Sequence, residues 1–258
     1  MYKSRSVSVV IPTYNEADSI REVINGFFAT GFVDEVVVVD NNALGNTKEE
    51  IEKTKARRIH ESENQGYGHA LMRGLREAKG DLIVMCEADG TFDPSDLHKF
   101  LLYSDAFPAV FGTRTSRASI WSEAFMPFSV RFGNWAVAKV LETLHNGPTL
   151  TDVGCTFKLI SRQVLESLLP LFPLSSGDGR FSPEFMIWTV RRHWNPVEIP
   201  VMFKPRVGKS MYTGSIPKAA WLGWRMFLLI IKYRFVSLKA EAAISYELPK
   251  RVLGRNLF

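Results

Sequence analysis

The sequence contains little cysteine and histidine. Its two cysteines, Cys86 and Cys155, stand in apolar or turn contexts without metal-ligand spacing, and its five histidines are scattered without a clustered pair. So few cysteines argue against a disulfide framework and favour a reducing compartment. Without paired histidine and cysteine ligands, a zinc site is not expected.

Long hydrophobic runs are also missing. The most apolar stretch of the last third, residues 221–231, is interrupted by Arg225 and closed by Lys232. It is far shorter than the roughly 20 residues that a spanning helix needs. The apolar run after the basic N-terminus is broken at Pro12, so no signal peptide is predicted. A processive synthase that passes a polymer across a membrane is therefore disfavoured.

The composition is that of a globular protein with a basic excess. Of 258 residues, 46% are hydrophobic and 23% are charged, and the formal net charge is +5. This length suits one α/β domain, or one domain with a small appendage. The positive charge suggests an anionic partner such as phosphate, nucleic acid or a membrane. Because the basic residues flank acidic strand ends instead of forming one stripe, nucleic acid is disfavoured.

Short apolar runs alternate with helical patterns along most of the chain. Strands are predicted at residues 7–11, at 36–39, around Ile59, between Gly80 and Gly90, and at 109–112. A further strand at residues 197–201 contains a proline, which favours the edge of a sheet. Strands that alternate with helices imply an α/β fold with a mostly parallel sheet.

Acidic residues follow two of the predicted strands. Glu87 and Asp89 are two apart, so both point to one side of an extended chain, at the strand end where open α/β sheets bind ligands. They can clamp one Mg²⁺ or Mn²⁺ with a diphosphate-bearing substrate, or they merely cap the next helix. Asp40 is either an acceptor for a nucleobase or ribose, or a turn former.

Arginine and aromatic residues mark the second half of the chain. Arg114, Arg117 and Arg131 suit phosphate because the planar guanidinium donates two parallel hydrogen bonds. For the aromatic residues between 121 and 135 we expect one of two places: against lipid, or on an amphipathic helix that packs on the sheet. Around residues 221–231, tryptophans among basic residues predict a helix in the headgroup region of a membrane, or a helix packed on the domain.

Six motifs occur together in one order. They are Val9-Val10-Ile11-Pro12-Thr13-Tyr14-Asn15-Glu16, Val38-Val39-Asp40-Asn41-Asn42, Glu87-Ala88-Asp89, Gly112-Thr113-Arg114, Asp152-Val153-Gly154-Cys155-Thr156-Phe157-Lys158 and Arg206-Val207-Gly208-Lys209-Ser210. This ordered set resembles family 2 glycosyltransferases of the GT-A fold, and within them the polyprenyl (dolichyl) phosphate mannosyl- and glucosyltransferases. The likeness covers about residues 6–210.

The resemblance implies a Rossmann-like GT-A sheet and a site built from these motifs. Glu87 and Asp89 would hold Mg²⁺ or Mn²⁺ on the donor diphosphate, and Glu184 would lie near the sugar. Arg114 and Arg131 would grip the phosphate of the acceptor. The other implied substrate contacts are Pro12, Tyr14, Glu16, Asp40 and Asn42 at the nucleoside, Arg206 and Lys209 over the diphosphate, and Asp152.

The sequence departs from the family pattern at several motif positions. Glu87 replaces an aspartate and Thr91 replaces a frequent glutamine, which alters the expected metal ligands. Asn41 replaces a second aspartate after the second strand, so the base cannot be read there. Cys155 and Thr156 stand where Ser-Gly is frequent, a change expected to affect the pocket for the acceptor or the sugar.

The resemblance implies a function and a division of the chain. Residues 1–212 would form the catalytic domain, with a nucleotide-binding half at 1–112 and an acceptor half at 113–212, and residues 213–258 an amphipathic membrane-associated segment. We expect an inverting transfer of a hexose from a GDP-mannose-type or UDP-glucose-type donor to a polyprenyl phosphate, on the cytoplasmic face of a membrane. Because phosphate is largely ionised at neutral pH, this transfer needs no strong base.

Two alternatives stay open. The acceptor is instead a hydroxyl of a glycan, lipid or small molecule in cell-surface polysaccharide synthesis, in which case Glu184 or Asp152 is the candidate base. The other alternative is a non-catalytic module that binds nucleotide sugars or a membrane surface. The amphipathic C-terminal segment also allows a homodimer contact in place of a membrane contact.

Overall fold

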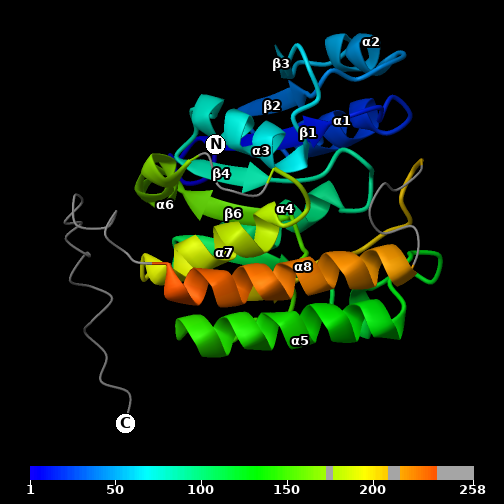
Figure 1. The fold of residues 1–258 in the computed structure, drawn as a ribbon. Coiled ribbons are helices and arrows are strands. Elements are labelled where there is room, and N and C mark those ends of the chain that lie inside the picture. Colours follow the sequence, from blue (N-terminus) through cyan, green and yellow to red (C-terminus); the bar gives the residue numbers. More distant parts are fainter. Residues whose placement is uncertain (173–176, 209–215, 237–258) are drawn as a thin grey trace.

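The computed structural model describes residues 1–172, 177–208 and 216–236. Seven strands form one sheet in the order β3-β2-β1-β4-β6-β5-β7 (Figure 1). β6 runs antiparallel to β4 and β5, and the other neighbouring strands are parallel, which confirms the predicted mostly parallel α/β sheet. The strands are β1 (Val7–Thr13), β2 (Glu35–Asp40), β3 (Arg57–His60), β4 (Leu82–Met85), β5 (Ala109–Thr113), β6 (Lys158–Ser161) and β7 (Val197–Pro200).

Helices cover both faces of the sheet. Short 3₁₀ turns occur at η1 (Pro94–Asp96), η2 (Arg117–Ser119) and η3 (Leu169–Leu171). The predicted edge position of the proline-containing strand is confirmed, because β7 is last in the sheet order. The helices are α1 (Ile20–Ala29), α2 (Thr47–Glu52), α3 (Tyr67–Glu77), α4 (Leu97–Tyr103), α5 (Phe128–His145), α6 (Arg162–Leu168), α7 (Phe181–Arg191) and α8 (Ile216–Phe235).

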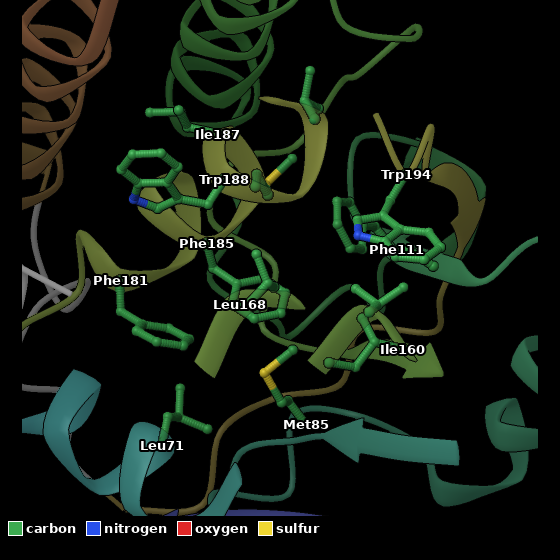
Figure 2. Packing of buried hydrophobic residues seen from close by; sticks show 14 of the residues in the cluster. Leu71, Met85, Phe111, Ile160, Leu168, Phe181, Phe185, Ile187, Trp188 and Trp194 are labelled. Carbon is green, nitrogen blue, oxygen red and sulfur yellow. The ribbon is translucent and has the colours of Figure 1, made fainter. Parts of the chain in front are cut away.

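Two hydrophobic cores lie on opposite faces of the sheet. Alternate residues of β1 illustrate the division, since Val10 belongs to one core and Val9 to the other, as expected for a strand that is buried on both faces. One core takes side chains from α1, α2 and α4, and the other from α3, α5, α6, α7 and α8. In the second core, the rings of Phe181 and Phe185 of α7 stack with their centres 5.6 Å apart, in the same cluster as Leu71 and Met85 (Figure 2).

Close packing of α3 on the sheet depends on a glycine. A Cβ at Gly74 would come within 2.3 Å of Val10 Cγ1 and 3.0 Å of Val39 Cγ2. A side chain there would therefore push α3 away from β1 and β2. The absence of a side chain at Gly74 therefore lets α3 lie close against β1 and β2.

The C-terminal helix α8 packs on the domain along one face and exposes the other. Met226, Leu229 and Ile230 are buried in the second core, and α8 lies alongside α5 (Figure 1). The prediction of a helix packed on the domain is confirmed for this face. Trp221 and Trp224 on the other face are 64% and 52% exposed. Within the described ranges, no helix is both long enough and apolar enough to cross a bilayer.

Candidate active site

The carboxyl ends of the central strands open into one large cavity. Its volume is about 1160 Å³. Polar residues from the ends of β1, β4 and β5 line one part, including Glu16, Asp89 and Arg114. Apolar residues of α5 and α8, including Val137 and Met226, line the other part. The sheet edge at which ligands were expected is therefore continuous with a channel between two helices.

Asp89 is held at the polar end by its own turn and by a distant loop. Thr91 donates to Asp89 Oδ1 through its backbone N–H at 3.0 Å and its hydroxyl at 2.6 Å. Arg206 Nη1 donates to Asp89 Oδ2 at 2.5 Å, and Arg206 Nη2 donates to Glu16. Thr91, at the position where a glutamine is frequent, thus acts in this structure by fixing the Asp89 carboxylate.

Glu16 completes this cluster from the loop after β1. Burial raises the pKa of Glu16 to about 7, even though the nearby Arg206 guanidinium acts to lower it. The same guanidinium bridges Glu16 and Asp89. The structure therefore brings together three residues predicted to bind the donor, which lie far apart in the sequence. Lys209, predicted to act beside Arg206, falls outside the described residues.

Glu87 faces a different set of neighbours. Thr156 Oγ1 donates to Glu87 Oε1 at 2.8 Å, and the Tyr67 hydroxyl lies 3.5 Å from the same oxygen. Burial, followed by the charge of Asp89, raises the pKa of Glu87 to about 7. The side chains of Glu87, Thr156, Tyr67 and Asp89 all line the cavity. Tyr67 is a cavity residue that sequence reasoning missed; its place at the start of a helix facing the strand ends was the available signal.

Arg114 and Asp152 form a buried ion pair beside the cavity. Arg114 Nε and Nη2 donate to the two Asp152 oxygens at 2.9 and 3.0 Å, the two-bond geometry that suits a guanidinium and a carboxylate. Burial acts to raise the pKa of Asp152, but the Arg114 guanidinium and hydrogen bonds from Arg114 and Gly154 outweigh it and hold the pKa low. Arg114 lines the cavity, as predicted for an acceptor contact, and Asp152 stays ionised.

Two predicted catalytic residues are not brought to the cavity lining. Glu184 is fully buried on α7, where it accepts a hydrogen bond from the Tyr233 hydroxyl of α8. Its helix turns this carboxylate into the core between α7 and α8, so the geometry does not support a sugar contact. Arg131 lies on α5 with its guanidinium 5.8 Å from the centre of the Phe128 ring. Its neighbours Val130 and Phe132 line the cavity, but Arg131 does not.

The predicted nucleoside contacts are divided by the structure. Pro12 and Tyr14 line the cavity, whereas Asp40 and Asn42 do not. Asp40 is 1% exposed because Arg58 Nε of β3 donates to it at 2.8 Å. An ion pair between neighbouring strands thus replaces the expected contact of Asp40 with a base or ribose.

Other polar groups near the ends of β1 and β2 do line the cavity. Asn41 and Asn64 line the cavity, and the Asn41 amide donates to Asn64 Oδ1 at 2.7 Å. Thr13 lines it too, and its Oγ1 is buried without a hydrogen-bond partner in the described part of the chain. A buried hydroxyl without a partner is costly, which makes Thr13 a candidate contact for a bound ligand.

The donor set fits a hard divalent cation. Glu87 and Asp89 offer carboxylate oxygens to the same cavity, the ligand type that Mg²⁺ and Mn²⁺ prefer. Among residues 1–172, 177–208 and 216–236, no three or more histidine, cysteine or acidic side chains are grouped closely enough to hold a metal by themselves. Mg²⁺ is commonly held by one or two carboxylates together with substrate phosphates, so the residues fit a metal that binds with a diphosphate.

Comparison with known sequences finds relatives that share most of this chain. The family model described as glycosyl transferase family 2 matches residues 8–169. A dolichyl-phosphate hexose transferase of Haloferax volcanii is 28% identical over 211 residues, which cover 81% of this chain and 87% of that protein. An undecaprenyl-phosphate 4-deoxy-4-formamido-L-arabinose transferase of Edwardsiella ictaluri is 28% identical over 218 residues, 80% of this chain and 62% of that protein.

Solved structures share the fold. The glucosyl-3-phosphoglycerate synthase of Mycobacterium tuberculosis, crystallised with Mn²⁺, uridine diphosphate and phosphoglyceric acid, superposes with a TM-score of 0.69. The superposition covers 92% of this chain and 81% of that one, at 18% sequence identity. At this identity the likeness concerns the fold, and it confirms the predicted GT-A architecture.

Proposed function

The chain belongs to glycosyl transferase family 2, and on that premise we propose that this glycosyltransferase moves a hexose from a nucleotide sugar to the phosphate of a polyprenyl phosphate. The donor is of the GDP-mannose or UDP-glucose type. Attack by a phosphate oxygen on the anomeric carbon, opposite the leaving nucleoside diphosphate, inverts the configuration at that carbon. The names of the two relatives, which act on dolichyl and undecaprenyl phosphates, support this acceptor class.

The observation that carries the proposal is the two-part cavity. Its polar part contains the Glu16, Asp89 and Arg206 cluster, and its apolar part runs between α5 and α8. A nucleotide sugar suits the polar part, whereas a polyprenyl chain needs an apolar one. Arg114 lines the same cavity, and its positive charge suits the acceptor phosphate.

The two carboxylates that the sequence offered as the base for a hydroxyl acceptor are not placed to act as one. Transfer to a hydroxyl would need a base, and Asp152 and Glu184 were the candidates. Asp152 is bound to Arg114, which holds its pKa low, and Glu184 accepts a hydrogen bond from Tyr233 outside the cavity lining. A phosphate with a second pKa near 6 is already ionised at neutral pH and needs no such base.

A divalent metal held at Asp89, the second carboxylate after β4, is part of the proposal. When bound, Mg²⁺ or Mn²⁺ would offset the negative charge that develops on the leaving nucleoside diphosphate. Arg206 would contribute a second positive charge, since its guanidinium already lies against Asp89. The synthase with the same fold, which is crystallised with Mn²⁺ and uridine diphosphate, supports this assignment.

We further propose that the outer faces of α5 and α8 rest on a membrane surface. Phe125, Phe132 and Ile216 are 49%, 55% and 53% exposed, and they also line the cavity. The apolar part of the cavity therefore reaches the surface among exposed aromatic and aliphatic side chains, where a lipid tail could enter. Basic residues on α8, including Lys218 and Lys232, suit anionic headgroups.

Radiolabelled nucleotide sugars test the proposed reaction. Each donor is incubated with the enzyme, polyprenyl phosphate and Mn²⁺ or Mg²⁺, and label is followed into lipid. The expected product is a lipid whose sugar is released by mild acid, formed only with metal and lost in Asp89→Ala. Label in an acid-stable glycan, lipid or small molecule would instead identify a hydroxyl acceptor and remove the proposed role of Arg114.

A further inference from the structure

The two carboxylates after β4 are held by different parts of the protein. Asp89 is bound by Arg206, from the loop after β7. Glu87 is bound by Thr156, from the segment before β6, and lies near Tyr67, the first residue of α3. The sequence assigned both carboxylates to one metal. In the structure they lie close enough for Asp89 to raise the pKa of Glu87, and each also has hydrogen-bond partners of its own.

Hydrogen positions on the Glu87 side follow from counting protons. A hydroxyl group has one proton to donate. Thr156 Oγ1 lies 2.8 Å from Glu87 Oε1, and the Tyr67 hydroxyl lies 2.6 Å from Thr156 Oγ1. Thr156 uses its one proton to donate to Glu87 Oε1, so the Tyr67 hydroxyl is the donor to Thr156 Oγ1. This chain of hydrogen bonds ends on Oε1 and fixes the orientation of the Glu87 side chain.

The fixed carboxylate is suited to accept hydrogen bonds from a ligand. Both protein hydroxyls approach Oε1, whereas a carboxylate has about four lone-pair positions on its two oxygens. Because the protons of Tyr67 and Thr156 are already used, the cluster offers acceptors to the cavity and needs donors in return. A sugar, which carries several hydroxyl groups, supplies such donors.

The cluster lies between the two ends of the proposed site. Glu87 is two residues from Asp89, whose carboxylate meets Arg206 at the donor end. Thr156 is two residues from Gly154, and a Cβ at Gly154 would come within 2.9 Å of Arg114 Nη2. The transferred sugar must lie between the leaving diphosphate and the attacking phosphate, which is the region that this cluster borders.

We propose that Glu87, Tyr67 and Thr156 form a recognition site for hydroxyl groups of the transferred sugar, and that Asp89 is the carboxylate that holds the metal. The inference rests on the proposed function and assigns Glu87 to sugar binding. A single carboxylate is compatible with Mg²⁺, which commonly takes one or two protein carboxylates and completes its shell with phosphate and water. The choice of donor sugar then depends on these three side chains.

A measurement of nucleoside diphosphate binding distinguishes the roles of Glu87 and Asp89. Mn²⁺ is titrated into the protein with UDP or GDP present, and bound Mn²⁺ is measured from the loss of the free-ion electron paramagnetic resonance signal. Asp89→Asn abolishes this Mn²⁺-dependent binding. Glu87→Gln and Thr156→Val keep it within about 2-fold of wild type, because their contacts are made with a sugar that is absent here.

Binding of the full donor gives the opposite pattern. Calorimetry gives the affinity of the preferred nucleotide sugar and that of its nucleoside diphosphate, and we compare the ratio of the two. This ratio should fall roughly tenfold in each of Glu87→Gln, Thr156→Val and Tyr67→Phe, which corresponds to the loss of about one hydrogen bond. Thr156→Ser, which keeps the hydroxyl, restores the wild-type ratio. A donor that lacks the contacted hydroxyl binds wild type and Glu87→Gln equally well, as a double-mutant cycle requires.

The outcomes distinguish this inference from the proposed function. Loss of Mn²⁺-dependent diphosphate binding in Glu87→Gln would make Glu87 a metal ligand and overturn the inference, and an unchanged ratio in all three variants would leave the cluster a purely structural role. Either result leaves the proposed reaction standing. If wild type binds neither UDP nor GDP with Mn²⁺, the proposed function and the inference fail together.

Discussion

The strand ends and the α5–α8 helix pair differ in which side chains they bury and which they expose. At the strand ends, charged groups such as Asp152, Asp89 and Asp40 are buried and each meets an arginine. On α5 and α8, large aromatic side chains such as Phe128 and Trp221 are 72% and 64% exposed. At the strand ends, the buried charges are paired within the fold. The α5–α8 pair instead leaves apolar surface exposed, which is typical of a surface that meets a partner.

The largest effect should come from breaking a buried ion pair at the strand ends. In Asp152→Asn, Arg114 remains buried without its partner charge, and removing one member of such a pair costs about 3–5 kcal/mol. Urea unfolding should show this loss in the free energy of unfolding. Glu52→Gln, which breaks an exposed pair with Lys48, is the control and should change it by less than about 1 kcal/mol. Equal losses would contradict the distinction between the buried and exposed pairs.

Activity should respond most to Asp89. We expect Asp89→Asn to lower kcat/KM on the order of 100-fold or more, because the metal that offsets charge on the leaving group is no longer held. Asp93→Asn is a matched control from the same segment, since Asp93 caps η1 and pairs with Lys204 near the surface. Its kcat/KM should stay within about 2-fold of wild type. Comparable losses in both variants would indicate a general disturbance of the segment.

Membrane contact should depend on the exposed face of α8. Trp221→Ser and Trp224→Ser should each weaken binding to vesicles that contain anionic lipid by roughly tenfold, since burial of one large side chain contributes about 1.5–3 kcal/mol. Cosedimentation measures the binding. Tyr103→Ser removes an aromatic ring that is 45% exposed on α4 and should leave binding unchanged. Unaltered binding in both tryptophan variants would exclude this face of α8 from the membrane contact.

The smallest effect is a pH dependence from Glu16. Because its pKa is raised to about 7 in the folded protein, the folded state keeps a proton that the unfolded state has released. Stability should therefore fall as the pH rises from about 4.5 to 7. A shift of this size corresponds to about 3 kcal/mol for a fully buried group, but Glu16 is only partly buried, and solvent screening reduces the effect. In Glu16→Gln the fall should therefore be shallower by about 1 kcal/mol, measured by urea unfolding at several pH values. Glu49→Gln, an exposed change on α2, should keep the wild-type slope.

Much of the fold could be predicted from local patterns in the sequence. Runs of valine and isoleucine in β1 and β2 are buried on both faces of the sheet, and Ile20, Val23 and Ile24 of α1 face the core as their helical spacing predicts. These patterns depend on the period of a strand or helix, which is a property of neighbouring residues. The order of the motifs likewise placed the donor residues at the carboxyl edge of the sheet.

The partners of the charged residues were decided only by the tertiary structure. Asp40 pairs with Arg58 from the neighbouring strand, and Asp152 pairs with Arg114. Glu184 accepts a hydrogen bond from Tyr233, which lies 49 residues later in the sequence. A carboxylate bonds whichever donor the fold brings near it, and no periodicity in the sequence records that distance. The sequence by itself therefore determined the sheet and the order of the site motifs, whereas the tertiary structure decided which carboxylates face the cavity and which are used to hold the fold together.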